Sequence, residues 1–159
     1  MTKFLDMDGE KDLEKLLAGC SPVLSASEFV FVSFPGSRYG GHPELSPIAF
    51  IVEDEGATLV VPRSEADAHQ ISYQSVFKRI TLNIHSSLEA VGLTAAVSRA
   101  LSDLGISANV IAGFFHDHIF VPSAVAGEAL SALENLFSET MPETKPGGQD
   151  EIVQSAPSG

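Results

Sequence analysis

The chain has 159 residues, which is enough for one domain of ordinary size or for two very small ones. Its net charge of −12, from 9 basic and 21 acidic residues, argues against proteins that bind nucleic acid or a membrane through a basic surface. The apolar fraction of 44% argues against a disordered protein, and the single cysteine, Cys20, excludes an internal disulfide.

The first ten residues contain no apolar core segment, so we expect no signal peptide. No window approaches 18 consecutive apolar residues, so we expect no membrane-spanning helix. A cytoplasmic location is the resulting expectation.

The first half of the chain predicts a helix, then strands separated by one long loop. The helix spans 8–19, with Leu13, Leu16 and Leu17 on one face and Gly19 as its stop. The strands are predicted at 22–24, 29–34, 48–52 and 58–62, and the Pro/Gly-rich loop covers 35–47. A capping box of the S-x-x-D form at 64–67 opens a short helix that ends near residue 70.

The second half predicts a more regular order of elements. The segment 72–85 ends in a clear alternation, with Ile80, Leu82 and Ile84 on one face. A second capping box, of the S-x-x-E form at 86–89, opens a helix that reaches residue 104 and stops at Gly105. Its apolar stripe is Leu93, Val97, Leu101 and Leu104. Strands follow at 107–115 and 118–122, then a helix that Ser123 caps, with the stripe Ala126, Leu130, Leu133 and Phe137. From residue 138 onward the composition predicts a disordered tail.

The two halves repeat one order of elements. The strands that end at Pro62 and at Pro122 both finish in Val-Pro, both follow a strand and a turn, and both precede a helix. The segment 72–85 is long enough to close the first unit and open the second, and 22–24 could supply the closing strand of the second. We therefore expect two interleaved α+β units, each ferredoxin-like (βαββαβ), with antiparallel sheets and helices on one face. The expected boundaries are 1–72, 73–137 and the tail 138–159.

Residues 86–122 resemble an ACT domain. Val91-Gly92-Leu93 matches the glycine-bearing turn of that family, and the residues 105–109 (GISAN) match its Gly-Ile-x-x-x strand. The match is similar to a bacterial group of tandem ACT proteins, and to the ACT units of the eukaryotic cytosolic arginine sensor. The segments 29–40 and 73–82 resemble the N-terminal half of that group, although the first ACT helix is missing there. The resemblance implies binding of an amino acid or another small effector and transmission of the signal to a partner.

The triplet His116-Asp117-His118 is open to several interpretations. Two histidines on one strand face could ligate one metal ion, but the nearest further ligands, His85 and Asp103, stand at no characteristic spacing. A polar turn, in which Asp117 bonds its own backbone, is an alternative, and a ligand-facing Asp117 is another. No G-x-S-x-G, P-loop or G-x-G-x-x-G motif occurs, so we expect neither an enzyme nor a bound cofactor or metal.

The segment 86–93 is the predicted ligand site. A turn that feeds a helix N-terminus leaves backbone N–H groups without partners, and these attract a carboxylate. Gly92 would allow close approach, or alternatively tight packing of helix on sheet. Combined with the resemblance, this predicts a ligand-binding set of Ser87, Val91, Gly92, Leu93, Asn109 and Asp117, with Asp117 meeting the ligand's ammonium.

The sequence therefore predicts a non-catalytic regulatory protein that binds a small molecule, most simply an amino acid, and forms a homodimer. Nucleic acid and membranes are not expected partners. Two alternatives stay open: a small metal-dependent enzyme that uses His116 and His118, and an interaction module that has lost its ligand.

Overall fold

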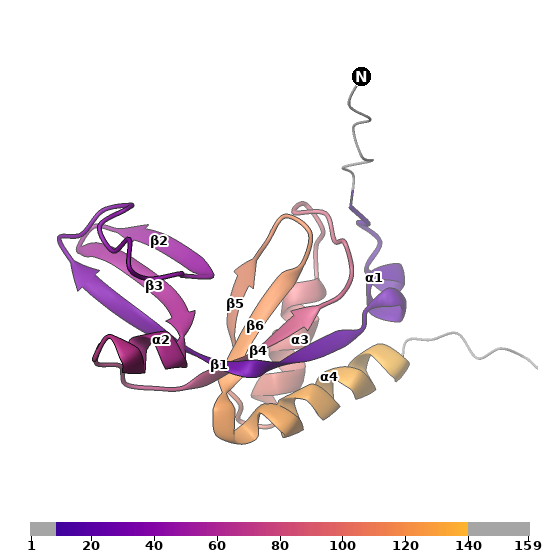
Figure 1. The fold of residues 1–159 in the computed structure, drawn as a ribbon. Coiled ribbons are helices and arrows are strands. Elements are labelled where there is room, and N and C mark those ends of the chain that lie inside the picture. Colours follow the sequence, from indigo (N-terminus) through magenta and orange to yellow (C-terminus); the bar gives the residue numbers. More distant parts are fainter. Residues whose placement is uncertain (1–8, 140–159) are drawn as a thin grey trace, which may run out of the picture.

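The computed structural model describes residues 9–139 of the chain. These residues form one six-stranded antiparallel sheet in the order β2-β3-β1-β4-β6-β5 (Figure 1). The helices are α1 (Leu13–Gly19), α2 (Arg63–Ala68), α3 (Leu93–Ser102) and α4 (Ala126–Glu139), with a 3-10 turn η1 (Ser123–Val125), and the strands are β1 (Pro22–Pro35), β2 (Ala49–Glu53), β3 (Gly56–Pro62), β4 (Phe77–Leu82), β5 (Asn109–Ala112) and β6 (Asp117–Pro122). Among these helices, none has the length and apolar character that a bilayer crossing requires.

The two units are joined at the centre of the sheet through the strands β1 and β4. The second part of β1, from Phe29 to Pro35, pairs with β3, whereas its first part, Pro22–Leu24, pairs with Leu82–Ile80 of β4. The second unit therefore has the ferredoxin-like strand order, with the first part of β1 as its fourth strand, whereas β4 meets the first-unit part of β1 only where Phe77 pairs with Phe29. The predicted role of 22–24 is confirmed, and 72–85 opens the second unit as predicted. It does not close the first unit, because 72–76 is not a strand. The two short strands expected at 22–24 and 29–34 are in fact one strand, with a register shift between Leu24 and Glu28.

The strand registers confirm the repeat. Phe29 pairs with Pro62, and Phe77 pairs with Pro122 in the same way. In the outer pairs, Ala49 lies opposite Val60 and Asn109 opposite Phe120, so both partners recur after 60 residues. The Val-Pro strand ends noted in the sequence thus occupy equivalent places.

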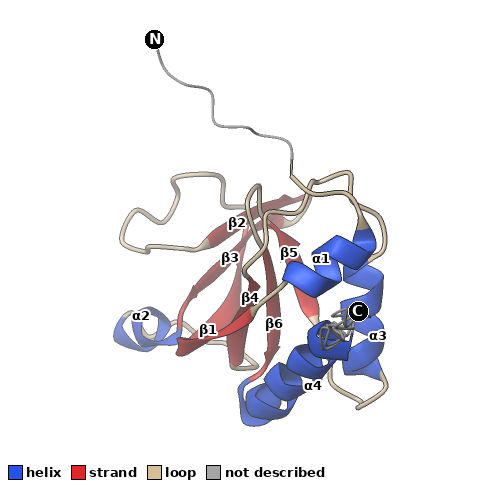
Figure 2. Ribbon diagram, turned by 90° about the vertical axis from the view of Figure 1, so that its right-hand side faces the viewer, coloured by secondary structure: helices blue, strands red, loops and turns tan. Residues whose placement is uncertain are grey.

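The helices lie on one face of the sheet. Figure 2 shows α1, α3 and α4 together beside the second unit, where they bury Ile80, Leu82 and Ile119. The helix α2 covers Val30, Leu59 and Val61 of the first unit on the same face. This burial of β-branched and leucine side chains is the main source of stability, at about 1.5–3 kcal/mol for each one.

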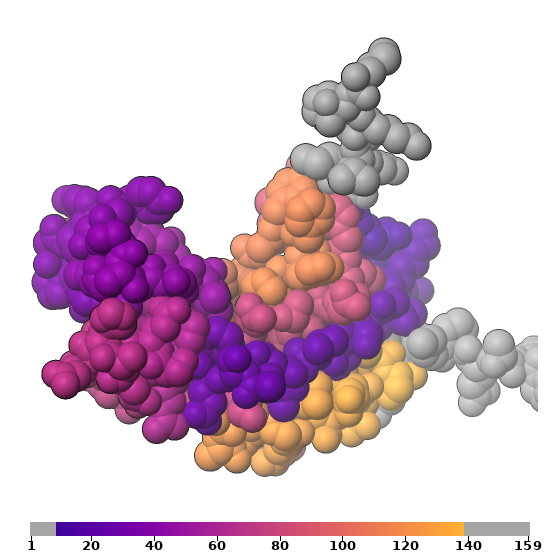
Figure 3. Space-filling view, viewed as in Figure 1, coloured from indigo at the N-terminus to yellow at the C-terminus, as the bar shows by residue number. Residues whose placement is uncertain are grey.

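The opposite face curls upon itself. Phe29, Val60 and Phe120 are buried there without a helix, and the Phe29 and Phe120 rings meet edge to face with centroids 5.9 Å apart. The sheet thereby bends into two lobes, and Figure 3 shows the hollow between the lobe of β2 and β3 and the lobe of β5 and β6.

The first unit lacks the helix that α3 supplies in the second. The loop 36–48, close to the predicted bounds of 35–47, stands in its place, and its Leu45 is buried against the first-unit core. One apolar side chain from a loop thus substitutes for a helix stripe.

Three predicted helix starts are wrong. The helix α2 begins at Arg63 and η1 at Ser123, both after prolines, and neither has a side-chain cap. The fixed φ of Pro62 and Pro122 prepares each start, so the predicted S-x-x-D box and the Ser123 cap are not used. The S-x-x-E box at 86–89 fails as well, because α3 begins only at Leu93.

Other boundaries differ from the prediction. The helix α1 begins at Leu13, where Asp12 accepts hydrogen bonds from Glu14 and Lys15, while residue 8 lies outside the described range. The strand β5 is shorter than 107–115 because Gly113 starts the hairpin turn to His116. Leu104 is 50% exposed because α3 ends at Ser102, although Gly105 adopts the left-handed φ of +70° that a stop requires.

The tail predicted from residue 138 overlaps α4, which continues to Glu139. Residues 140–159 lie outside the described residues.

Candidate ligand-binding site

The turn 86–92 is held by the segment that precedes α1. Glu10 forms a parallel bridge with Ser86, the Glu10 N–H donates to the His85 carbonyl, and the Ser87 N–H donates to the Glu10 carbonyl. We call Gly9 and Glu10 the strap. A Cβ atom at Gly9 would lie 2.4 Å from the Ser87 backbone nitrogen, so the strap needs a glycine there. The bridge holds Ser86 in an extended conformation, which is incompatible with a helix that starts at 86–89 and accounts for the late start of α3.

The N-terminus of α3 carries free donors. Gly92 is its N-cap residue, with φ +105° and no side-chain cap. The N–H groups of residues 93–95 have no acceptor within the described part of the chain, and the first helical bond runs from Ala96 to Gly92. An added Cβ at Gly92 would lie 2.8 Å from Leu13 Cδ2, so Gly92 is tightly packed, but against α1 and not against the sheet as the sequence analysis suggested.

A cavity of about 70 Å³ opens beside this helix end. Three predicted residues line it: Ser87, Leu93 and Asp117. The sequence interpretation missed the others, which are Ser86, Leu88, Ala90, Thr94 and Ala112. With the helix start at Leu93, Thr94 lies in the first helical turn. A prediction with that start would have included Thr94 in the site.

Val91, Gly92 and Asn109 do not line that cavity. Val91 is 82% exposed, and Gly92 lies in the chain between the lining residues. Asn109 begins β5 at its other end and lines a different cavity.

A second cavity of about 200 Å³ lies against the same turn. It shares Ser86, Ser87 and Leu88 with the first cavity. Its remaining lining residues are Lys11, His85, Glu89 and Phe114. The turn is therefore bordered by two adjacent spaces of different size.

Asp117 is the half-buried carboxylate of the site. Burial raises its pKa, and this effect is partly offset by His118, by a hydrogen bond with Ser86 and by His116. The same neighbourhood contains Cys20, where burial and then the charge of Asp117 raise the pKa of the thiol to about 12. One interpretation of the sequence placed Asp117 in the hairpin turn. In the structure Asp117 instead begins β6.

The histidines of the triplet have separate partners. His116 Nδ1 lies 3.3 Å from the Ile84 carbonyl oxygen, whereas His118 Nδ1 lies 3.0 Å from the Thr81 hydroxyl. Burial and then the Arg79 charge lower the pKa of His118. Within residues 9–139, no three His, Cys, Asp or Glu side chains cluster as a metal site would require.

Comparison with known protein families identifies the family to which this fold belongs. Residues 8–78 match one family profile and residues 75–135 match a second, and both are described as the ACT domain. This chain belongs to the ACT-domain family. Its two ACT units stand in tandem, as the sequence resemblance indicated.

The similar proteins fit this assignment. Over 80% of its length the chain is 46% identical to a Vibrio cholerae protein of unknown function described as a possible transport protein, with a TM-score of 0.72 and 97% of that chain covered. The regulatory subunit of Thermus flavus aspartate kinase shares the fold at 12% identity, with 73% of this chain and 96% of that chain covered and a TM-score of 0.55. Clostridium acetobutylicum aspartate kinase does so at 12% identity over 73% of this chain and 34% of that enzyme, with a TM-score of 0.56. No curated protein sequence gives a significant match.

The first ACT unit has a different cavity at the place where its helix is missing. This cavity of about 210 Å³ is lined mainly by the loop, with Tyr39, His42 and Leu45 among its residues. The His42 ring lies over Phe34 with centroids 3.7 Å apart. The loop provides no helix end here, so this cavity lacks the row of free N–H groups found at α3.

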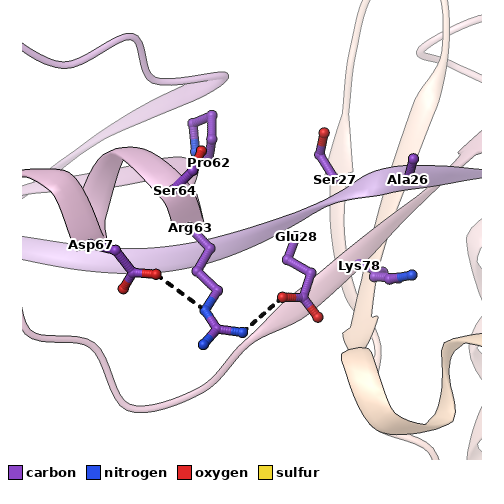
Figure 4. A pocket seen from close by; sticks show the side chains of 8 residues that line it. All are labelled: Ala26, Ser27, Glu28, Pro62, Arg63, Ser64, Asp67 and Lys78. Carbon is purple, nitrogen blue, oxygen red and sulfur yellow. Dashed lines mark hydrogen bonds and ion pairs between the residues drawn. The ribbon is translucent and has the colours of Figure 1, made fainter.

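A groove of about 410 Å³ marks the junction of the ACT units on the helix face (Figure 4). Arg63 lies between Glu28 and Asp67, with Nη1 2.9 Å from Glu28 and Nε 3.5 Å from Asp67. Glu28 also accepts a hydrogen bond from the Ser123 hydroxyl of the second unit, and these two partners lower its pKa. Most of these charged groups are paired with one another, so we interpret the groove as a set of ion pairs and hydrogen bonds that connects the two units. We call this set the tie.

Proposed function

We propose that this tandem ACT protein is a cytoplasmic, non-catalytic regulator that binds an amino acid at the turn 86–92 and the N-terminus of α3. The single observation that carries the proposal is the pairing of free N–H groups at residues 93–95 with the half-buried carboxylate of Asp117 across one small cavity. ACT domains are typically regulatory modules that bind ligands.

The chemistry suits a zwitterion. The amino acid's carboxylate accepts hydrogen bonds from the helix N-terminus, where the helix dipole also favours a negative charge. Its ammonium group lies toward Asp117, which then keeps its charge despite burial. The small cavity has room for these two groups only, so the ligand's side chain extends past Ser86 and Leu88 into the adjoining cavity of about 200 Å³.

The metal-dependent alternative has weaker support. His116 and His118 approach different partners, the Ile84 carbonyl and the Thr81 hydroxyl, rather than a common point. The alternative of an interaction module without a ligand differs from our proposal in one outcome, which is the absence of saturable binding.

Thermal-shift screening of the full chain against the twenty amino acids tests the proposal. A ligand that binds only the folded state adds about 2.7 kcal/mol of stability at a concentration of ~100 times Kd. At least one amino acid should therefore raise the melting temperature.

Asp117→Asn tests the role of the carboxylate. It keeps the shape and removes the charge, so affinity should fall roughly 10- to 150-fold, which corresponds to about 1.5–3 kcal/mol. The matched control is Asp103→Asn at the other end of α3, where the side chain is exposed and affinity should not change. Unchanged binding by Asp117→Asn would move the ammonium site away from this carboxylate.

We also infer that the chain pairs with itself. Four apolar side chains of the turn 86–92 and of the β5–β6 hairpin are exposed: Leu88, Val91, Phe114 and Phe115. Leu88 and Phe114 also line the cavity of about 200 Å³. Exposed apolar patches of this kind mark interaction surfaces. Sedimentation equilibrium should find a dimer that Phe115→Asp weakens, and a monomer at all concentrations would contradict this inference.

A further inference from the structure

A cavity of about 590 Å³ lies where the two ACT units meet, away from the turn 86–92. It is lined by Phe31, Val32 and Ser33 of β1, by residues 72–75 of the connecting segment, by Phe77 of β4 and by Asn109 of β5. A space of this size accommodates ligands of drug-like dimensions, and junctions between structural units are common places for such sites.

The backbone around this cavity is unpaired. The pairing of β1 with β4 ends at Phe29 and Phe77, so beyond Phe29 the edge of β1 that faces β4 has no neighbouring strand. The segment 72–76 lies beside it and is not a strand. In the described residues none of its N–H groups has an acceptor, and of its carbonyls only that of Val76 accepts, from the Ser123 N–H at 3.0 Å.

The side chains offer further unused hydrogen-bonding groups. Ser33, Ser72, Gln74 and Ser75 are exposed and make no side-chain hydrogen bond within the described part of the chain. The Asn109 amide has one long contact, 3.4 Å from Nδ2 to the Phe120 carbonyl. Donors and acceptors from both units therefore converge on one space.

The walls also contain an apolar surface. The Phe31 and Phe77 rings are only partly buried and meet edge to face, with centroids 5.3 Å apart. The Tyr73 hydroxyl is occupied by Arg63 and Asp67 on the helix side. None of the lining side chains carries a charge, in a protein with 21 acidic residues.

We propose that this cavity is a second binding site, which takes an uncharged molecule of nucleoside or sugar size with one flat apolar face and several hydrogen-bonding groups. A charged ligand would lose its hydration here without gaining a counter-charge. The flat face packs on Phe31 and Phe77, while the polar groups pair with the segment 72–76 and with Asn109. This site is independent of the proposed amino acid site, which needs a zwitterion.

Amide NMR titration of the full chain tests the proposal directly. The probes are adenosine, uridine and methyl glucoside, up to concentrations on the order of 10 mM, where weak binders saturate. We expect saturable shifts of the amides of residues 72–76 with at least one probe, because these N–H groups gain acceptors, and no shift of residues 93–95. The absence of saturable shifts with all three probes would overturn the proposal, as would shifts confined to 93–95.

Two variants locate the site. Ser33→Trp fills the cavity from an exposed strand position and should weaken probe binding by about tenfold or more. Its matched control is Ser64→Trp, which alters the junction groove instead and should leave binding unchanged. If Ser33→Trp does not fold, Gln74→Ala on the exposed segment serves in its place, with an expected loss of roughly 2- to 12-fold. Equal effects of the two tryptophan variants, or unchanged binding by Gln74→Ala, would contradict the assignment.

Discussion

The two ACT units pair their strands in the same register but cover the sheet in different ways. In the second unit, α3 buries Leu93, Val97 and Leu101 against the sheet. In the first, the loop 36–48 covers the equivalent face with the single buried residue Leu45. Strand pairing therefore determines the fold, because the strand registers of the two units stay the same although one apolar side chain replaces a helix in the first unit.

The same difference separates the units at the proposed binding site. A helix N-terminus with free N–H groups occurs at α3, and the loop of the first unit offers no equivalent. The α2 helix of the first unit is only six residues long and follows Pro62, at the place equivalent to the start of η1. On this account the proposed amino acid site belongs to the second unit alone.

Core truncation should affect the two units unequally. Leu101→Ala should cost about 3–4 kcal/mol of unfolding free energy, because Leu101 is fully buried in the core that α3, α4 and the sheet form together. Leu45→Ala should cost about 2 kcal/mol, because a loop can relax into the space left behind. Urea unfolding measures both values. A larger cost for Leu45→Ala would show that the loop is as rigid as the helix.

The two left-handed glycines at the ends of α3 provide a second contrast. Gly92→Val and Gly105→Val both place a side chain at a positive φ, +105° and +70°. Only Gly92 has a neighbour, Leu13 of α1, whereas an added Cβ at Gly105 meets nothing within 4 Å. Gly92→Val should therefore cost about 1–3 kcal/mol more than Gly105→Val, by overpacking against α1. Equal losses of stability in thermal unfolding would mean that α1 moves away freely.

The tie between the units should depend on pH. The Ser123 and Arg63 contacts lower the pKa of Glu28 below the ordinary glutamate value of 4.5. Since a carboxylate with a lowered folded pKa stabilises the folded state above its unfolded pKa, this stability is lost as the pH falls through the folded pKa. The stability difference between wild type and Glu28→Gln should thus be largest near neutral pH and shrink as the pH falls below the ordinary glutamate pKa of 4.5. Glu134→Gln, on an exposed position of α4, is the control for removal of a surface carboxylate.

The interleaved fold could be predicted from the sequence because its signals are local and repeated. The Val-Pro strand ends at Pro62 and Pro122 indicated the repeat, the alternation of Ile80, Leu82 and Ile84 indicated a strand, and the ferredoxin-like plan then predicted how the strands pair. The start of α3 could not be predicted, because a contact from far along the chain, the Glu10 strap on Ser86, overrides the local S-x-x-E pattern. The same limit applies to the proposed site. Asp117 and Ser87, which local chemistry and the resemblance indicated, line one cavity, whereas Asn109 lies at the other end of β5 and lines another.

The number and place of amino acid sites test the central claim most directly. The amino acid with the largest thermal shift is titrated into the full chain by calorimetry, and amide NMR then locates it. We predict one molecule per chain, with shifts of the N–H groups of residues 93–95 as they gain a carboxylate acceptor. Two molecules per chain, shifts centred on the loop 36–48, or no saturable binding of any amino acid would contradict the account.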